Sequence, residues 1–423
     1  MTQTAEREAS LERRDDRRRV AGRARRRRCS RPGAIQIGHP ERPVRLRHLL
    51  PPRGKGSARG GSPYEISGYY YTPLVAVVIA PLANVHHAAQ IWLAMGLAAA
   101  VGAALIGAWA CRPSGTLPFG LLVTTSLVTL LYSWPAVLEA WRAQVQWLVL
   151  LCIVTAALLS RRHAVASGTA LGMAALIKTW PAVLFTWLLG RSALRKLPVL
   201  AAGAVATVIA VLMSVAVGGA AGIRAMVTSP LAGADQPLVS YSVWGLGKMA
   251  FAESGIAPPI TVSPGLQWTT WVILGGGLAC LAAVTLLSRV DEELRLFNLV
   301  FVVILAMPVS HFMYVMLPLP ALWWWMARAM EHPRAWVPWI GLGTLGSWWV
   351  LVFRLSPAAL QSTSTTWPTY LTILGSTLVA ASVSIIAGAV WHPRQRPVSA
   401  VPDDLRLDPG SRLVDELPEP PRP

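Results

Sequence analysis

The stretch GTALGMAALIKTWPAVLFTWLLGRSALR, residues 168–195, is almost wholly apolar but carries Lys178 in its middle and Pro181 three residues later. Basic residues flank it on both sides, so the chain must enter a membrane and leave on the same face if positive loops stay cytoplasmic. Only residues 164–190 separate His163 from Arg191, too few for two helical crossings of about 20 residues each. The stretch therefore predicts two short helices with a break near residues 178–181, because proline removes an amide donor and disfavours helix in the residue before it.

Lys178 lies at this predicted break. A charge and irregular backbone at membrane depth are tolerated only beside protein or a water-filled cavity. Lys178 is therefore a candidate site residue. The alternative is a structural role, in which its ammonium binds backbone carbonyls exposed by the break.

The composition is that of a polytopic membrane protein. Of 423 residues, 54% are hydrophobic and 14% are charged, well below the roughly 25% charged residues of soluble domains. The formal net charge is +18, but most of it lies in residues 1–60, which are rich in Arg, Pro and Gly and have no apolar run. We expect this tail to be disordered, with no nucleic-acid partner. Two alternatives are a polybasic segment that binds anionic lipid or nucleic acid, and sequence that does not belong to the protein.

The apolar runs predict an all-α protein with about 9–11 membrane segments, including two broken helix pairs. Residues 61–392 form the predicted transmembrane domain, and the Pro-rich residues 393–423 a disordered cytoplasmic tail. Residues 133–143 and 218–267 are predicted loops. The predicted spans are 88–110, 117–131, 144–159, 197–217, 268–287, 336–352 and 370–390, with 74–85 as an interfacial or re-entrant helix.

A second broken pair is predicted over residues 296–307 and 313–326, around Pro308 and His311. Three consecutive tryptophans, residues 323–325, are expected at the inner membrane interface. The loop charges place the C-terminus in the cytoplasm, which leaves the Arg-rich tail outside, against the positive-inside tendency. Either the tail is translocated, or a first transmembrane helix is missing from this chain.

Four stretches resemble glycosyltransferase family 87, the polyprenol-phosphate-mannose-dependent mannosyltransferases with the GT-C membrane fold. They occur along the chain in the same order as in the family. The closest match is GTALGMAALIKTWPAVLFTWLL, which resembles the family's Gly-x-x-x-Gly-x-Ala-x-x-x-Lys-x-x-Pro. The other three contain departures from the family pattern, at Thr72, Ala143, Gln146, Met307 and His311. They read GGSPYEISGYYYTPLVAVVIAPLANV (60–85), LEAWRAQVQWLVLLCIV (138–154) and MPVSHFMYVMLPL (307–319).

The resemblance implies an inverting transferase of the plasma membrane, with its active site facing outside. It would move a hexose, mannose in the family, from a polyprenyl-phosphate donor to a lipid or glycan acceptor, among membrane lipids and without a cofactor. The family's catalytic base is an aspartate shortly before the Pro-Tyr motif. Residues 39–60 hold no Asp here, and the role does not transfer to Glu41. We therefore expect that the first helix and loop are lost or misrepresented, and a truncated, inactive member is one alternative.

Sugar transfer from a lipid phosphate needs a carboxylate that takes a proton and cationic groups that stabilise the departing phosphate. Lys178 is the candidate for the phosphate contact and Asp235 the remaining candidate for the base, although loop aspartates are usually solvated. Gln144 could bind sugar hydroxyls or make an interhelical contact, and His311 could orient phosphate or lie at the interface. Glu139 and Arg142 could simply pair with each other. The substrate-binding candidates are Lys178, Gln144, His311, Tyr71 and Tyr241.

No metal site is expected, because the four cysteines show no metal-binding spacing. The rival function is a transporter or flippase for a lipid-linked substrate, since broken helices near a central charge are also typical of transporters. Inverted internal repeats would favour the transporter, but the sequence shows no convincing internal repeat. A non-catalytic subunit is the third possibility.

Overall fold

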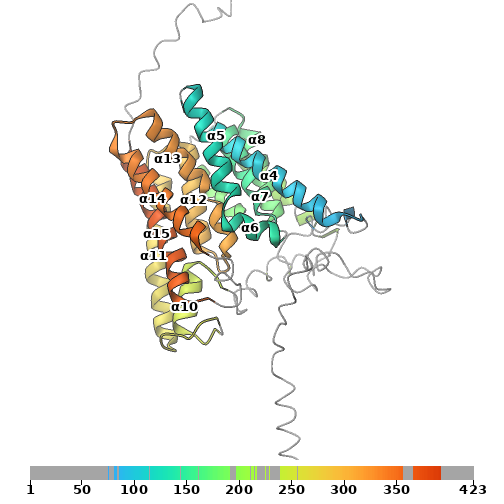
Figure 1. Ribbon diagram of the computed structural model, residues 1–423. Coiled ribbons are helices and arrows are strands. Elements are labelled where there is room, and N and C mark those ends of the chain that lie inside the picture. Colours follow the sequence, from blue (N-terminus) through green and yellow to red (C-terminus); the bar gives the residue numbers. More distant parts are fainter. Residues whose placement is uncertain are drawn as a thin grey trace, which may run out of the picture. The chain divides into compact units, whose positions relative to one another are not determined.

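In the computed structural model every regular element of the described residues is helical, which confirms the all-α prediction (Figure 1). The structure describes residues 75, 81, 82 and 85–391. Within the last range it leaves gaps at 114, 143, 161, 191–196, 210, 214, 217–223, 225–227, 229–238, 255 and 356–364. Both predicted tails lie outside this part of the chain, as do Tyr71 and Asp235.

The helices follow the predicted spans closely. Six of them, α4, α5, α7, α11, α14 and α15, begin and end within four residues of the expected positions. The elements are α4 (Ala88–Ala110), α5 (Thr116–Leu131), α6 (Trp134–Trp141), α7 (Gln146–Leu159), α8 (Ala164–Ile177), η3 (Trp180–Gly190), a helix over Leu197–Met213, α10 (Val243–Phe251), α11 (Pro264–Leu287), α12 (Glu292–Ala306), η4 (Phe312–Met316), α13 (Leu319–Glu331), α14 (Trp336–Arg354) and α15 (Trp367–Val390).

Four helices of the described chain are long and apolar enough to cross a membrane, namely α4, α11, α14 and α15. A fifth span results if α5 and α6, which meet at a 55° bend, are taken together. The remaining apolar helices, among them α7, α8 and η3, are shorter than a full crossing. The chain therefore has the architecture of a multi-pass membrane protein that combines full spans with shorter segments.

Two predicted loops contain helices instead. Residues 133–143 hold α6, which Ser133 caps by accepting a hydrogen bond from the Ala136 amide, and Pro135 lies in its first turn. The predicted loop 218–267 holds α10, which Ser242 caps in the same way through the Gly245 amide. Serine caps and an early proline are ordinary helix start signals. Both regions were predicted as loops because helices this short cannot span a membrane.

The first broken pair is confirmed at the predicted position. Helix α8 ends at Ile177, and Lys178 has an extended backbone with φ −147° and ψ 135°. Then η3 continues for 11 residues as a 3-10 helix, although 3-10 runs longer than 3–4 residues are uncommon. The Trp187 indole donates to the Glu292 carbonyl at 3.0 Å, so a hydrogen bond joins η3 to the start of α12.

The second broken pair is also confirmed. Helix α12 ends at Ala306, and α13 begins at Leu319 after η4. Asp291 directly precedes α12, and its Oδ2 lies 3.5 Å from Nη2 of Arg328 in the last turn of α13. The two ends remote from the break therefore meet, and the chain reverses direction inside the bundle.

The paired glycines of the opening stretch allow α8 to approach the helix over Leu197–Met213 closely. A Cβ added at Gly168 would lie 2.7 Å from the Val199 carbonyl oxygen, and one at Gly172 would overlap the Ala206 methyl group. Small residues four apart are typical of close helix contacts in membranes, where the hydrophobic effect between helices is lost. The Gly-x-x-x-Gly spacing thus has a packing role in this fold.

Tryptophans 323–325 are buried inside the bundle and do not face lipid, and their depth at the inner membrane interface stays a prediction. Their indole N–H groups need partners there, because an unpaired donor in an apolar interior is costly. The Trp323 indole donates to the Thr129 hydroxyl of α5 at 2.9 Å. The Trp325 indole donates to Ser384 of α15, which donates onward to Asn298 of α12. Trp323 and Trp325 therefore connect α13 to three other helices, whereas the Trp324 indole N–H has no hydrogen-bond partner among the described residues.

Replacement of Gly172 by alanine tests the close approach of α8. We expect Gly172→Ala to lower the stability of the protein in detergent by about 1–3 kcal/mol, the usual cost of overpacking. The measurement is the midpoint of thermal unfolding. Gly276→Ala in α11 is the matched control, because a Cβ at Gly276 meets nothing within 4 Å. Equal midpoints for the two variants would contradict the packing role.

Candidate functional site

A buried polar cluster lies where the two broken pairs meet. It consists of Glu139 of α6, Gln146 at the start of α7, Lys178 at the first break and Tyr314 of η4. All four side chains are buried, with Glu139 1% and Lys178 6% exposed. Helix α6 packs directly against η4, which brings the members of the cluster together from four separate elements.

Lys178 makes the central contacts of the cluster. Its ammonium donates a hydrogen bond to the Tyr314 hydroxyl and lies 4.2 Å from the centre of the Tyr314 ring. An ammonium that donates to a buried hydroxyl gains a charge-assisted hydrogen bond. The extended backbone at Lys178 and the turn before η4 together make this approach possible, so the contact depends on both breaks.

Glu139 is the acidic member of the cluster. One carboxylate oxygen accepts the backbone N–H of Gln146, at the N-terminus of α7, where a helix favours negative charge. The carboxylate is also close enough to act electrostatically on Lys178 and Tyr314. It therefore ties α6 to the start of α7.

Several polar atoms of the cluster have no hydrogen-bond partner among the described residues. They are the second carboxylate oxygen of Glu139 and both polar atoms of the Gln146 side chain, which lies beside the Tyr314 hydroxyl. Buried polar groups are paired in the great majority of cases, and exceptions often mark places that water or a ligand completes. The cluster can thus accept a further polar group.

His311 lies at the edge of this cluster. It is half-buried, directly precedes η4, and its ring centre lies 5.9 Å from that of Tyr314. The structure therefore brings together Lys178 and His311, two of the predicted site residues, from breaks that are more than 130 positions apart in the chain.

Gln144 and Tyr241 are positioned differently. Gln144 is half-buried and lines a very small cavity beside Trp147, and its backbone N–H donates to the Glu139 carbonyl at 3.1 Å. The Tyr241 backbone N–H donates to the Ser310 carbonyl at 2.7 Å, and its ring stacks on Tyr370. Tyr241 thus anchors the second break to α15.

Burial raises the pKa of Tyr241 to about 12, against the opposing effects of the neighbouring Thr365 hydroxyl and the Arg142 charge. The phenol is therefore neutral at physiological pH. It can exchange hydrogen bonds with a substrate, but it cannot supply a negative charge.

Sequence reasoning missed three members of the cluster in their present roles. Glu139 was expected in a loop, where it could pair with Arg142, but it lies on α6 and is buried. Tyr314 and Gln146 were inside recognised stretches but were not singled out. A buried acid in WPAVLEAW was the available signal, because an ionisable residue inside an apolar helix indicates a function or a partner.

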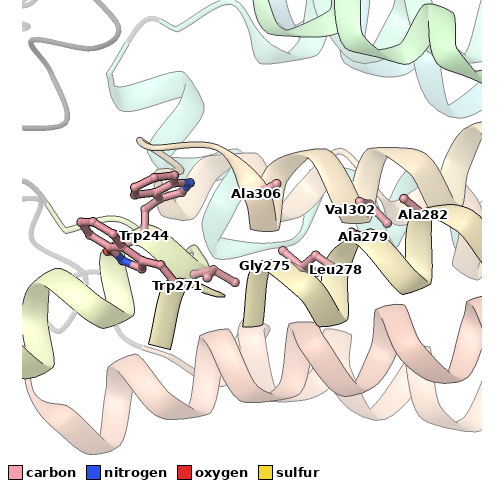
Figure 2. Close-up of a pocket in the computed structure, with 9 residues that line it drawn as sticks. Trp244, Trp271, Gly275, Leu278, Ala279, Ala282, Val302 and Ala306 are labelled. Carbon is pink, nitrogen blue, oxygen red and sulfur yellow. The ribbon is translucent and has the colours of Figure 1, made fainter. Parts of the chain in front are cut away.

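An apolar cavity of about 260 Å³ lies between α10, α11 and α12, separate from the polar cluster (Figure 2). Trp244 and Trp271 lie side by side at one end. Small side chains, including Gly275, Ala279 and Ala306, line the remainder. This lining can accommodate a hydrocarbon chain but offers no charged group. Among the described residues no group of three or more His, Cys, Asp or Glu side chains could hold a metal ion.

Comparison with known proteins gives one result. The model of a family described as Glycosyltransferase family 87 matches residues 69–310, more than half of the chain. The matched region includes Glu139, Gln146 and Lys178, and it ends four residues before Tyr314. No curated protein matches the chain.

The charge coupling inside the cluster can be tested by stability. A buried charge pair predicts that Glu139→Gln and Lys178→Met each lower stability, by up to about 3–5 kcal/mol, because each leaves one charge without its counter-charge. The double variant removes both charges and should be more stable than at least one single variant. Thermal unfolding in detergent measures all four proteins. Strictly additive losses would show that the two charges do not interact.

Proposed function

Because the chain belongs to glycosyltransferase family 87, we propose that it transfers a hexose from a polyprenyl-phosphate donor to a lipid or glycan acceptor. The proposed sugar is mannose, and the proposed place is the outer face of the plasma membrane, with the C-terminus in the cytoplasm. The observation that carries the proposal is the family match, together with the buried ammonium of Lys178 at a helix break. A multi-pass membrane protein is also a suitable catalyst for a donor that is itself anchored in lipid.

In the proposed reaction the acceptor hydroxyl oxygen attacks the anomeric carbon, and its proton passes to a carboxylate. The bond between the anomeric carbon and the phosphate oxygen breaks, and the leaving phosphate takes the electron pair. Lys178 stabilises that phosphate as a point charge, and the Tyr314 hydroxyl assists by holding the ammonium. Asp235 remains the candidate for the carboxylate that accepts the proton, although it lies outside the described residues.

The proposed binding mode requires movement, because Lys178 is only 6% exposed. Donor binding would separate the two breaks so that a phosphate oxygen reaches the ammonium. The long 3-10 helix η3 supports such a movement, since 3-10 stretches often mark hinges. His311 would then contact the phosphate or the acceptor, and Gln144, Tyr241 and Tyr71 would contribute hydrogen bonds to the sugar.

The apolar cavity beside α11 supports a lipid-linked donor. Its tryptophans and small side chains (Figure 2) provide apolar surface for part of an isoprenoid chain, whose burial is favourable. In this proposal the isoprenoid chain of the donor contributes binding affinity, and the phosphate and sugar determine where the reaction occurs.

Transport of a lipid-linked substrate is the second candidate function. Two helix pairs broken near a buried charge favour it, because secondary transporters bind substrates at such breaks. A catalytically inactive family member is the third. These alternatives differ from the enzyme in one respect: neither makes a new glycosidic bond.

Transfer of radiolabelled mannose from polyprenyl-phosphate mannose by membranes that contain the protein tests the proposal. We expect transfer by the wild type and a loss of about 10–100-fold in Lys178→Met, the equivalent of one charged hydrogen bond of roughly 1.5–3 kcal/mol. Lys248→Met in α10 is the control for loss of a lysine elsewhere and should retain activity. Absence of transfer by the wild type would overturn the enzymatic function, and donor movement across the bilayer without transfer would favour the transporter.

A further inference from the structure

We propose that the side chains of Gln146 and Glu139 form the subsite for the sugar of the donor and bind two of its hydroxyl groups. The inference rests on the proposed function, in which Lys178 contacts the phosphate of the same donor. It gives a binding role to Gln146, a residue that the sequence analysis did not single out.

The first argument is a set of unsatisfied polar atoms at the start of α7. Gln146 is fully buried, and neither the oxygen nor the nitrogen of its side-chain amide has a hydrogen-bond partner among the described residues. The same holds for Oε2 of Glu139, whereas Oε1 accepts the backbone N–H of Gln146. Three unpartnered atoms therefore lie on two side chains that a hydrogen bond connects. Buried polar atoms are costly unless a partner completes them, so the arrangement indicates a polar ligand.

The second argument places Gln146 at the same end of a helical hairpin as the break at Lys178. Helices α7 and α8 pack against each other, and their short connection, residues 160–163, makes them antiparallel. The Ser167 hydroxyl donates to the Ala156 carbonyl at 2.8 Å, which sets the register of the pair. Gln146 lies ten residues before Ala156, and α8 ends ten residues after Ser167. The start of α7 and the end of α8 are therefore level with each other.

A second connection leads through η4. Tyr314 of η4 accepts a hydrogen bond from Lys178, and η4 packs against α6, the helix that carries Glu139. In a polyprenyl-phosphate sugar a single oxygen joins the phosphate to the sugar, so the groups that bind these two parts must be neighbours. The arrangement of Lys178, Glu139 and Gln146 meets this requirement.

The third argument compares the free atoms with the parts of the donor. An isoprenoid chain has no hydrogen-bonding group. A phosphodiester offers acceptors only, which would leave the free oxygens of Gln146 and Glu139 without donors. A hydroxyl group both donates and accepts, so two neighbouring hydroxyls can donate to these oxygens and accept from the Gln146 amide nitrogen. The sugar is the part of the donor that carries such groups.

The subsite is closed in this structure, as is the site of the Lys178 ammonium: Gln146 is 0% and Lys178 6% exposed. The same separation of the two breaks that admits the phosphate would admit the sugar. Opening would also let water or substrate satisfy the unpartnered atoms, whose lack of partners raises the free energy of the closed state. The polar atoms of the subsite thus favour the movement that the proposed function requires.

The affinities for two lipids test the inference. Full-length wild type, Gln146→Met and Gln267→Met are titrated in nanodiscs with polyprenyl-phosphate mannose and with polyprenyl phosphate, and each Kd is measured by tryptophan fluorescence. Methionine removes both polar atoms but keeps the backbone N–H that Glu139 accepts. We expect Gln146→Met to bind polyprenyl-phosphate mannose about 10-fold more weakly, as for the loss of one or two neutral hydrogen bonds, and polyprenyl phosphate with unchanged affinity. Gln267, half-buried on α11, is the control, and Gln267→Met should retain both affinities.

Thermal unfolding of the ligand-free proteins separates a ligand site from a structural one. Because the amide atoms of Gln146 have no described partner, an apolar side chain of similar size should leave Tm unchanged or raise it. A Tm well below that of the wild type in both Gln146→Met and Gln146→Leu, or failure of both to fold, would mean that the amide completes the protein itself, directly or through buried water. That result would overturn the inference.

The same measurements distinguish failure of this inference from failure of the proposed function. If the wild type transfers mannose and Gln146→Met retains the wild-type ratio of the two Kd values, the inference alone is overturned, even where transfer is slower. A wild type that neither transfers mannose nor binds either lipid overturns the proposed function, and the sugar subsite falls with it.

Discussion

The burial of one ammonium group, that of Lys178, is the constraint on which the centre of this structure depends. A positive charge in a low-dielectric interior has to be compensated. Here the Tyr314 hydroxyl of η4 binds it directly, and the buried acid Glu139 of α6 belongs to the same polar cluster. The two broken pairs and the short helix α6 are therefore parts of one arrangement, in which irregular backbone is placed where polar groups are available to meet it.

Much of this fold could be predicted from the sequence, because its strongest signals are local. The break at Lys178 followed from the length of the apolar stretch and from Pro181, and the boundaries of α4 followed from a continuous apolar run. The partners of Lys178 could not be found in this way, since Tyr314 is 136 positions away. No periodic pattern connects them. The helices α6 and α10 were missed for a different reason: a criterion based on membrane thickness ignores helices of eight or nine residues.

Packing between the helices follows the rules of a lipid environment. Because lipid chains are as apolar as leucine, helices associate through close approach of small residues and through hydrogen bonds between them. The contact of Gly172 with Ala206 represents the first mechanism, and the chain from Trp325 through Ser384 to Asn298 represents the second. Tryptophan serves here as a long-range donor inside the bundle, which explains why a cluster typical of a membrane interface is buried.

The ion pair between Asp291 and Arg328 limits how the second broken pair can move. It joins the beginning of α12 to the end of α13, far from η4. A rearrangement that preserves this ion pair is therefore a bending about the joined end, with little displacement near Arg328 and the largest displacement near Tyr314. The displacement would increase along α12 and α13 from Arg328 toward Tyr314. The residues that face Lys178 would therefore move most.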